Sequence, residues 1–338
     1  MLRRPPVLLD IESEPSLAGV KLIAEAWDAA GLYQVGSFIG DAWKEWNGQF
    51  RDDVRGFFRG ENGSVARVAD RLIGSPQIFG HEKREAEQSI NFVTCHDGFT
   101  LNDLVSYERK HNETNGEHNR DGMNENRSWN CGVEGPTDDP AVERLRNRQV
   151  KNFLTATLIS LGIPMILMGD EVRQTQQGNN NAYCQDNEIG WFDWRRVATH
   201  QDVHRFVRLL IARRSMRDTE SEPRRVNLEQ LIREATREWH GVKLHRPDWS
   251  ESSHSLALGA ELKKEGLRMH LILNAYWEPL EFELPADKKY FWRRWIDTGL
   301  DSPDDIVEWQ TAPPVQGFIY RVEPRSVALL YTKIRGPE

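Results

Sequence analysis

Three short and nearly continuous runs of apolar residues stand out in the first half of the chain. They cover residues 20–27 (VKLIAEAW), 90–97 (INFVTCHD) and 164–171 (PMILMGDE), and each contains carboxylates close to its end. Runs of this length are typical of strands buried on both faces, as in a parallel sheet or barrel, although a buried helix segment would look the same. A weaker strand near residues 45–50 would add one more unit between the first two runs.

Other segments repeat their apolar residues at helical spacing. Residues 64–74 precede the second run, and residues 140–162 precede the third, opening on Pro140 and closing on Gly162. Proline at the first helical position and glycine just past the last are typical of helix ends. Another amphipathic segment covers residues 202–216. The alternation of strands and helices indicates the α/β class.

The pattern changes after about residue 217. A charged connector at residues 219–240 leads into short segments of alternating apolar and polar residues, which turn residues separate. Four of these segments read as strands: 254–262, 268–276, 280–285 and 327–333. Their spacing predicts an antiparallel β-sandwich at residues 241–338, behind an α/β domain at residues 1–218. A length of 338 residues also favours two domains over one.

Charge and composition exclude several functions. The chain has 44 basic and 52 acidic residues, which gives a net charge of −8 and no basic footprint for nucleic acid or an anionic membrane. No apolar run approaches the roughly 18 residues of a membrane span. The three cysteines lack disulfide-scaffold or zinc-ligand spacing. We therefore expect no membrane, no nucleic acid and no metal, and a neutral or cationic ligand.

Carboxylates mark the ends of the three apolar runs. They are Glu25, Asp97, and Asp170 or Glu171. In α/β barrels the catalytic groups lie where strands end at one face, so that different strands direct side chains at one point. A single carboxylate in such a place is more often only a polar residue where a strand surfaces. Three strand ends in one α/β run favour a site, but they identify no reaction.

The strings around these carboxylates are more specific. AEAWD (24–28), FVTCHDG (92–98) and GIPMILMGDE (162–171) resemble the segments at the ends of the fifth, seventh and eighth barrel strands of the α-amylase superfamily, glycoside hydrolase family 13. Four further strings resemble its isoamylase and bacterial glycogen-debranching branch: KEWNGQFRDDVRGF (44–57), NRDGMNENRSWNCGVEG (119–135), QTQQGNNNAYCQDNEIGWFDW (174–194) and WHGVKLHRPDW (239–249). The resemblance implies the C-terminal half of a (β/α)8 TIM barrel, strands five to eight, followed by the sandwich.

The resemblance also implies a reaction. It is the retaining hydrolysis of α-1,6 branch points in glycogen, amylopectin or limit dextrin, without a metal or organic cofactor. Glu25 would be the general acid and base, which requires a raised pKa. Asp97 would stabilise the oxocarbenium-like transition state, and His96 would hydrogen-bond the same sugar ring.

Further residues are candidates for substrate binding through the same resemblance. Trp27 could stack on a sugar face or simply pack in the barrel, and the amide-rich loops could bind hydroxyl groups or read as ordinary turns. Asp170, with Glu171, could bind substrate or brace the loops around the site. The full set of these candidates is His96, Trp27, Trp129, Asp170, Asn180, Asn181 and Tyr183.

The nucleophile expected of this mechanism is not found. A retaining glycosidase needs a second carboxylate about 5–5.5 Å from the acid. In the family it is an Asp on the fourth strand, in a Gly-Phe-Arg-Phe-Asp-like string, and neither Asp10 nor Asp28 lies in such a string. We therefore expect the isolated chain to be inactive, and its partner to be the missing N-terminal half of the enzyme, which would cover its exposed strand edges.

Two other interpretations stay open. One is a different α-glucan-active hydrolase or transglycosylase of the superfamily. The other is a non-catalytic subunit that binds α-glucan or serves in assembly. We expect a cytoplasmic protein, or a plastid protein if the source is a plant.

Overall fold

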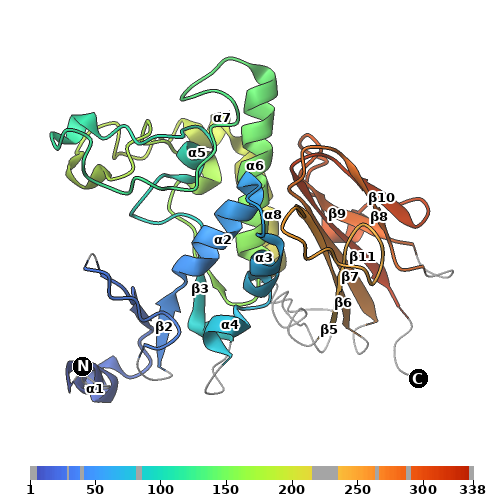
Figure 1. Ribbon diagram of the computed structural model, residues 1–338, viewed down its shortest axis with the longest axis horizontal. Helices are drawn as coiled ribbons and strands as arrows, with labels where there is room; N and C mark the ends of the chain where they lie inside the picture. The colour runs from blue at the N-terminus through green and yellow to red at the C-terminus, as the bar shows by residue number, and fades with distance from the viewer. Residues whose placement is uncertain are drawn as a thin grey trace.

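The N-terminal region is built on a four-stranded parallel sheet (Figure 1). The computed structural model describes residues 6–28, 30–38, 42–80, 86–214, 235–262, 266–286 and 291–334. The strands are β1 (Leu22–Ala24), β2 (Trp43–Trp46), β3 (Ser89–Asn91) and β4 (Ile163–Pro164). Each pairs in parallel with the next along the chain, in the order β1-β2-β3-β4.

All four strands lie where the sequence predicted them, but they are shorter than the apolar runs. The run at residues 164–171 contributes only Pro164 to β4, which begins one residue before the run at Ile163, and its end is a 3₁₀ turn at Asp170–Val172. Pro164 has no N–H to donate to a ladder, and Gly169 turns the chain with φ 102°. Likewise the strand predicted at residues 45–50 ends at Trp46, because Asn47 caps a helix by accepting from the Phe50 N–H (2.9 Å).

Helices follow the second, third and fourth strands of the sheet, whereas the described residues between β1 and β2 contain no helix. The longest, α6, covers Pro140–Ile159 and is capped by Asp139, whose carboxylate accepts from the Ala141 N–H (2.8 Å). The helices predicted at residues 64–74, 140–162 and 202–216 are confirmed. The full set is α1 (Pro6–Ser13), α2 (Gly48–Arg59), α3 (Val65–Leu72), α4 (Pro76–Phe79), α5 (Leu101–Leu104), α6, α7 (Arg196–Thr199) and α8 (Gln201–Arg214).

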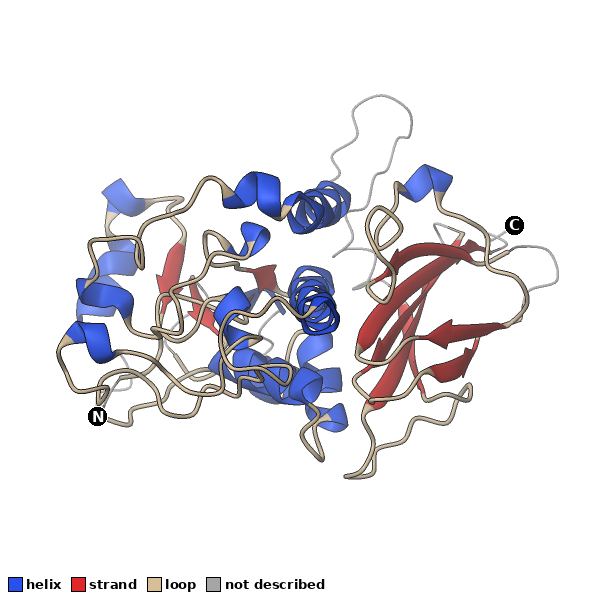
Figure 2. Cartoon of the chain, turned by 90° about the horizontal axis from the view of Figure 1, so that it is seen from above, coloured by secondary structure: helices blue, strands red, loops and turns tan. Residues whose placement is uncertain are grey.

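The C-terminal region consists of two antiparallel sheets (Figure 2). A five-stranded sheet has the order β5-β6-β7-β11-β9, and β8 pairs with β10. The strands are β5 (Thr236–His240), β6 (Ser255–Leu262), β7 (Leu267–Asn274), β8 (Leu280–Glu283), β9 (Arg293–Asp297), β10 (Ile319–Val322) and β11 (Ser326–Lys333). The four predicted strands are confirmed as β6, β7, β8 and β11. Strand β5 lies inside the predicted connector, whose residues 219–234 are outside the described residues.

The two regions share one hydrophobic core. Helices α3 and α6 pack on one face of the five-stranded sheet, where Leu72 and Ile159 lie with Leu258, Met269 and Leu329 around a small apolar gap. Buried polar contacts support this interface, including the ion pair of Lys151 Nζ with Asp305 Oδ2 (2.7 Å) and the bond from Asn152 Nδ2 to the Arg325 carbonyl (2.8 Å). The opposite face packs against β8 and β10 through Phe282, Trp292 and Val322.

Candidate active site

Glu25, His96 and Asp97 meet at the carboxyl-end side of the parallel sheet. Glu25 directly follows β1, and the other two residues lie beyond β3, which is separated from β1 by β2. One carboxylate oxygen or ring nitrogen from each lies within 4.8 Å of the other two. All three side chains are open to solvent, and His96 Nε2 is 3.7 Å from Asp97 Oδ2. The fold thus joins groups that are about 70 residues apart in sequence.

Trp46 forms a wall beside this cluster and was not identified from the sequence. It ends β2, the strand between β1 and β3, and its ring centroid is 5.6 Å from His96 and 5.4 Å from Phe92. The sequence feature that could have identified Trp46 is its place at the end of β2, the strand between those that lead to Glu25 and His96. A partly buried indole next to His96 offers an apolar surface to a bound sugar.

Buried contacts hold the segment from β3 to Asp97 in place. The Arg55 guanidinium donates from Nε to the Val93 carbonyl (2.9 Å) and from Nη1 to the Asn126 carbonyl (2.9 Å), and burial lowers its pKa to about 10. Gly98 turns the chain with φ 93° and donates its N–H to the Asn180 carbonyl (3.0 Å). These bonds fix the backbone on both sides of His96 and Asp97.

Asp170 braces the loops. Its carboxylate is buried, accepts from the Leu101 N–H (2.9 Å) and is hydrogen-bonded by the Thr94 hydroxyl. Burial raises its pKa to about 7. Glu171 accepts from the Gly169 N–H (2.8 Å). Of the two roles left open for this pair, bracing fits the geometry, and a substrate contact by the buried Asp170 does not.

The amide-rich loops bond mainly to one another. Asn180 is 1% exposed, accepts from Asn112 Nδ2 (2.9 Å) and donates to Asn126 Oδ1 (3.0 Å). Asn181 donates from Nδ2 to Asp121 Oδ2 (2.9 Å) and is partly buried. Asn180, which we expected to bind substrate, is therefore buried with its side-chain groups hydrogen-bonded inside the protein.

The three predicted aromatic candidates have different surroundings. Trp27 is half-buried, stacks on Tyr33 (centroids 6.2 Å apart) and lies against Gly48. Trp129 is partly buried with the Arg325 guanidinium 4.9 Å above its ring, so it packs between the two regions and does not join the Glu25 cluster. Tyr183 is 69% exposed and free to contact a ligand. Sequence reasoning missed two exposed aromatics of the same loop, Trp191 and Trp194.

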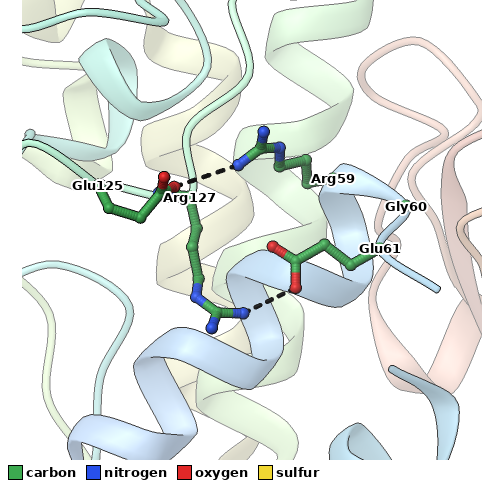
Figure 3. A pocket seen from close by; sticks show the side chains of 5 residues that line it. All are labelled: Arg59, Gly60, Glu61, Glu125 and Arg127. Carbon is green, nitrogen blue, oxygen red and sulfur yellow. Dashed lines mark hydrogen bonds and ion pairs between the residues drawn. The ribbon is translucent and has the colours of Figure 1, made fainter. Parts of the chain in front are cut away.

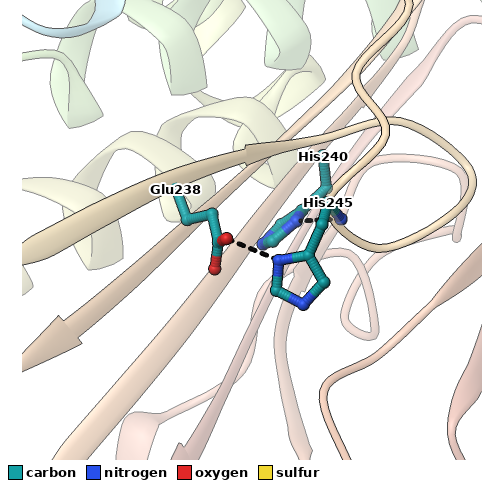
Figure 4. Close-up of side chains that lie close together, drawn as sticks. All are labelled: Glu238, His240 and His245. Carbon is teal, nitrogen blue, oxygen red and sulfur yellow. Dashed lines mark hydrogen bonds and ion pairs between the residues drawn. The ribbon is translucent and has the colours of Figure 1, made fainter.

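A second group of histidines lies at the edge of the five-stranded antiparallel sheet (Figure 4). Glu238, His240 and His245 lie at β5 and the turn after it, and His245 has φ 58°. The His245 N–H donates to His240 Nδ1 (2.9 Å), so the neutral His240 ring carries its proton on Nε2 and has no free lone pair for a metal. His245 Nδ1 is 2.5 Å from Glu238 Oε1. This cluster is therefore a hydrogen-bonded brace of the turn.

Two carboxylates and an imidazole, as at Glu25, could also hold a divalent cation. The hydrolysis implied by the resemblance does not require one.

Among the described residues, no helix has the length and apolar composition to cross a membrane.

The chain is similar in sequence to known proteins. Residues 238–331 match the family model described as isoamylase 1-3, C-terminal. The chain is 43% identical to isoamylase SU1, chloroplastic, of Zea mays over 90% of its own length and 38% of that protein. It is 55% identical to the glycogen operon protein GlgX homolog of Mycobacterium tuberculosis over 59% of its own length and 28% of that protein.

The fold is similar to that of a solved pullulanase. The pullulanase from Bacillus acidopullulyticus superimposes with a TM-score of 0.63 at 19% identity, over 96% of this chain and 35% of the other. The chain thus spans less than half of the length of the relatives it matches. On sequence, the chain belongs to the isoamylase and bacterial glycogen-debranching branch of the α-amylase superfamily, of which it represents a C-terminal portion.

Proposed function

We propose that the chain carries the acid/base side of an active site that hydrolyses α-1,6 branch points in α-glucans. The observation that supports this most is the meeting of Glu25, His96 and Asp97 within 4.8 Å at the ends of two strands of one parallel sheet. The sequential strand order β1-β2-β3-β4, with helices between β2 and β3 and between β3 and β4, supports a half (β/α)8 barrel, strands five to eight, followed by a sandwich.

Each residue then has a defined role in a retaining mechanism. Glu25 donates a proton to the glycosidic oxygen as the bond to the anomeric carbon breaks, and later takes a proton from the attacking water. Asp97 stabilises the positive charge that develops on the sugar ring, and His96 donates a hydrogen bond to a hydroxyl of the same ring. No metal or organic cofactor takes part.

The nucleophile would come from outside this cluster. The two carboxylates of the cluster are assigned, and Asp28 Oδ1 accepts from the N–H groups of Ala30 (2.8 Å) and Leu32 (2.9 Å), so it caps a turn. Two apolar side chains are left open, Ile23 on the edge strand β1 (49% exposed) and Met168 in the loop after the other edge strand, β4 (75% exposed), and they support a further segment packing there. We propose that the N-terminal half of a barrel supplies both the nucleophile and this cover.

The first experiment measures reducing ends released from glycogen and amylopectin limit dextrin by the pure 338-residue chain. We expect none, since a covalent glycosyl-enzyme cannot form. Release that persists in the Glu25→Gln variant would refute the assignment of Glu25. Release by the parent chain that is lost in the Glu25→Gln variant would refute only the proposal that another barrel half supplies the nucleophile.

The second experiment measures binding, which needs no turnover. In affinity electrophoresis through gels that contain glycogen, we expect the His96→Ala and Asp97→Asn variants to migrate faster than the parent chain. The exposed His204 gives a matched control, His204→Ala, which should migrate as the parent does. Unchanged retention in both site variants would contradict the proposed site.

The two carboxylates of the cluster also suit a non-catalytic glucan-binding subunit. This second function predicts the same binding and the same lack of turnover. It differs in that a barrel half carrying the nucleophile, when added, would restore no hydrolysis. Pullulan, amylose and glycogen as substrates of the restored enzyme would separate debranching from α-1,4 hydrolysis.

The cellular compartment stays a prediction: the cytoplasm or, in a plant, the plastid. The chloroplastic name of the maize relative supports the plastid.

A further inference from the structure

A polar cavity lies where the C-terminal end of α2 approaches the sandwich (Figure 3). It has a volume of about 290 Å³ and is lined by Arg59, Gly60, Glu61, Glu125 and Arg127. Helix α2 begins directly after β2 and ends at Arg59, and its 12 residues span about 18 Å. The cavity is therefore at the opposite end of this helix from the active-site cluster.

The charges around the cavity are balanced. Arg127 Nη1 pairs with Glu61 Oε2 (2.7 Å), and Arg59 Nη1 lies 3.4 Å from Glu125 Oε1. The second pair is largely exposed and weak, so both groups can exchange it for a ligand. A phosphate would meet two carboxylates here, whereas sugar hydroxyls can donate to the carboxylates and accept from the guanidinium groups. The cavity thus favours a neutral, hydroxyl-rich ligand.

An exposed aromatic platform lies in the turn that follows β7. Trp277 is 58% exposed and packs on Tyr276 with ring centroids 4.0 Å apart. The ring of the buried His254 supports it from 5.8 Å. A large exposed indole held in place by two other rings offers a flat apolar surface of the kind that sugar rings cover with their C–H groups.

Arg325 connects the platform with the cavity. Its N–H donates to the Tyr276 carbonyl (3.0 Å), and its Nη1 donates to the Arg59 carbonyl (3.3 Å) at the cavity wall. Arg325 has φ 54°, a conformation that non-glycine residues rarely adopt and that is often kept where function requires it. Platform and cavity are therefore one arginine side chain apart, within the reach of a short oligosaccharide.

We propose that this junction is a second α-glucan-binding site. One glucose ring stacks on Trp277, and hydroxyl groups of the neighbouring units bond to Arg59, Arg127 and Glu61. The choice of α-glucan among saccharides rests on the proposed function. The site holds a branched polymer on the protein while another of its chains reaches Glu25.

The test uses the whole 338-residue chain and measures its affinity for maltoheptaose by calorimetry and for glycogen by affinity electrophoresis. We expect the Trp277→Ala variant to bind about tenfold more weakly, since an aromatic stacking contact is worth about that factor. Trp277→Phe, which keeps a ring, should recover most of the affinity. Phe291→Ala removes another exposed ring of the sandwich and should bind as the parent does.

The Asp97→Asn variant separates this site from the active site. If Trp277→Ala weakens binding equally with and without Asp97→Asn, the junction site stands, whatever the fate of the active-site proposal. Parent-like binding by a folded Trp277→Ala variant, with weaker binding by Asp97→Asn, would overturn the junction site alone. Inorganic phosphate is the control ligand, and competition by phosphate at millimolar concentration would also overturn the proposal.

Discussion

The parallel sheet and the five-stranded antiparallel sheet are held together in different ways. Strand β1 has three residues, pairs with β2 alone within the described ranges and leaves Ile23 half-exposed. Strand β11 has eight residues, pairs with both β7 and β9 and buries seven of them. In the parallel region the long loops are held by buried side-chain bonds, such as those of Asn180 and Asp170. The candidate functional side chains lie on loops, whereas the C-terminal sheet is held by long antiparallel pairing.

The largest effect should come from a cavity in the sandwich. Leu329 is 1% exposed, between the five-stranded sheet and helices α3 and α6. We expect Leu329→Ala to lower the free energy of unfolding by about 2–5 kcal/mol. Urea denaturation followed by circular dichroism and tryptophan fluorescence measures it, with the exposed Lys333→Ala of the same strand as control. If the helical signal kept its midpoint while the sheet lost stability, the shared core would be refuted.

The buried carboxylate of the loops should make stability depend on pH. Burial raises the pKa of Asp170 to about 7, so the folded state binds a proton that the unfolded state has released, and stability falls as pH rises from about 4 to 7. Asp170→Asn does not titrate. Relative to the parent, we expect this variant to gain on the order of 3 kcal/mol between pH 5 and pH 8. Urea denaturation at both pH values measures this gain. The same gain in the exposed Asp138→Asn control would contradict the assignment to Asp170.

In the sandwich the pH dependence should have the opposite direction. His270 is fully buried, no described residue pairs with either ring nitrogen, and burial lowers its pKa to about 3. Stability is therefore lost as pH falls below about 6.5, where the unfolded histidine gains a proton. At pH 5 the loss is about 2 kcal/mol, and His270→Leu should abolish it. Melting temperatures at pH 5 and pH 7.5 test this. If the exposed His204→Ala control also abolished the loss of stability at pH 5, the assignment of that loss to His270 would be contradicted.

The smallest effect should come from the amide network. Asn180→Ala removes a partner of Asn112, Asn126 and the Met123 carbonyl. A water molecule can take the vacated place, so the cost should be on the order of 1 kcal/mol. Hydrogen exchange should nevertheless speed up in the peptide that contains Gly98, which donates to the Asn180 backbone. The exposed Asn124→Ala variant is the control and should exchange as the parent does. If Asn180→Ala exchanged as slowly as both, the network would not hold the loop.

Much of the fold could be predicted because its signals are local. Proline and glycine at the ends of residues 140–162 placed α6, and alternating residues placed β6, β7, β8 and β11. Strand lengths could not be predicted, because a strand ends where its neighbour or a cap ends its pairing, as Asn47 does after Trp46. Strands β5, β9 and β10 were missed because edge or short strands carry a weak alternation.

The sequence by itself determined the candidate chemistry: a glutamate after one apolar run and a His-Asp pair after another, in strings that resemble one enzyme family. Only the tertiary structure decided which candidates share a site. It brought Glu25 to His96 and Asp97, added Trp46, buried Asn180 and Asp170, and placed Trp129 under Arg325. The reason is physical, since burial and pairing depend on contacts between distant segments, which no local pattern records.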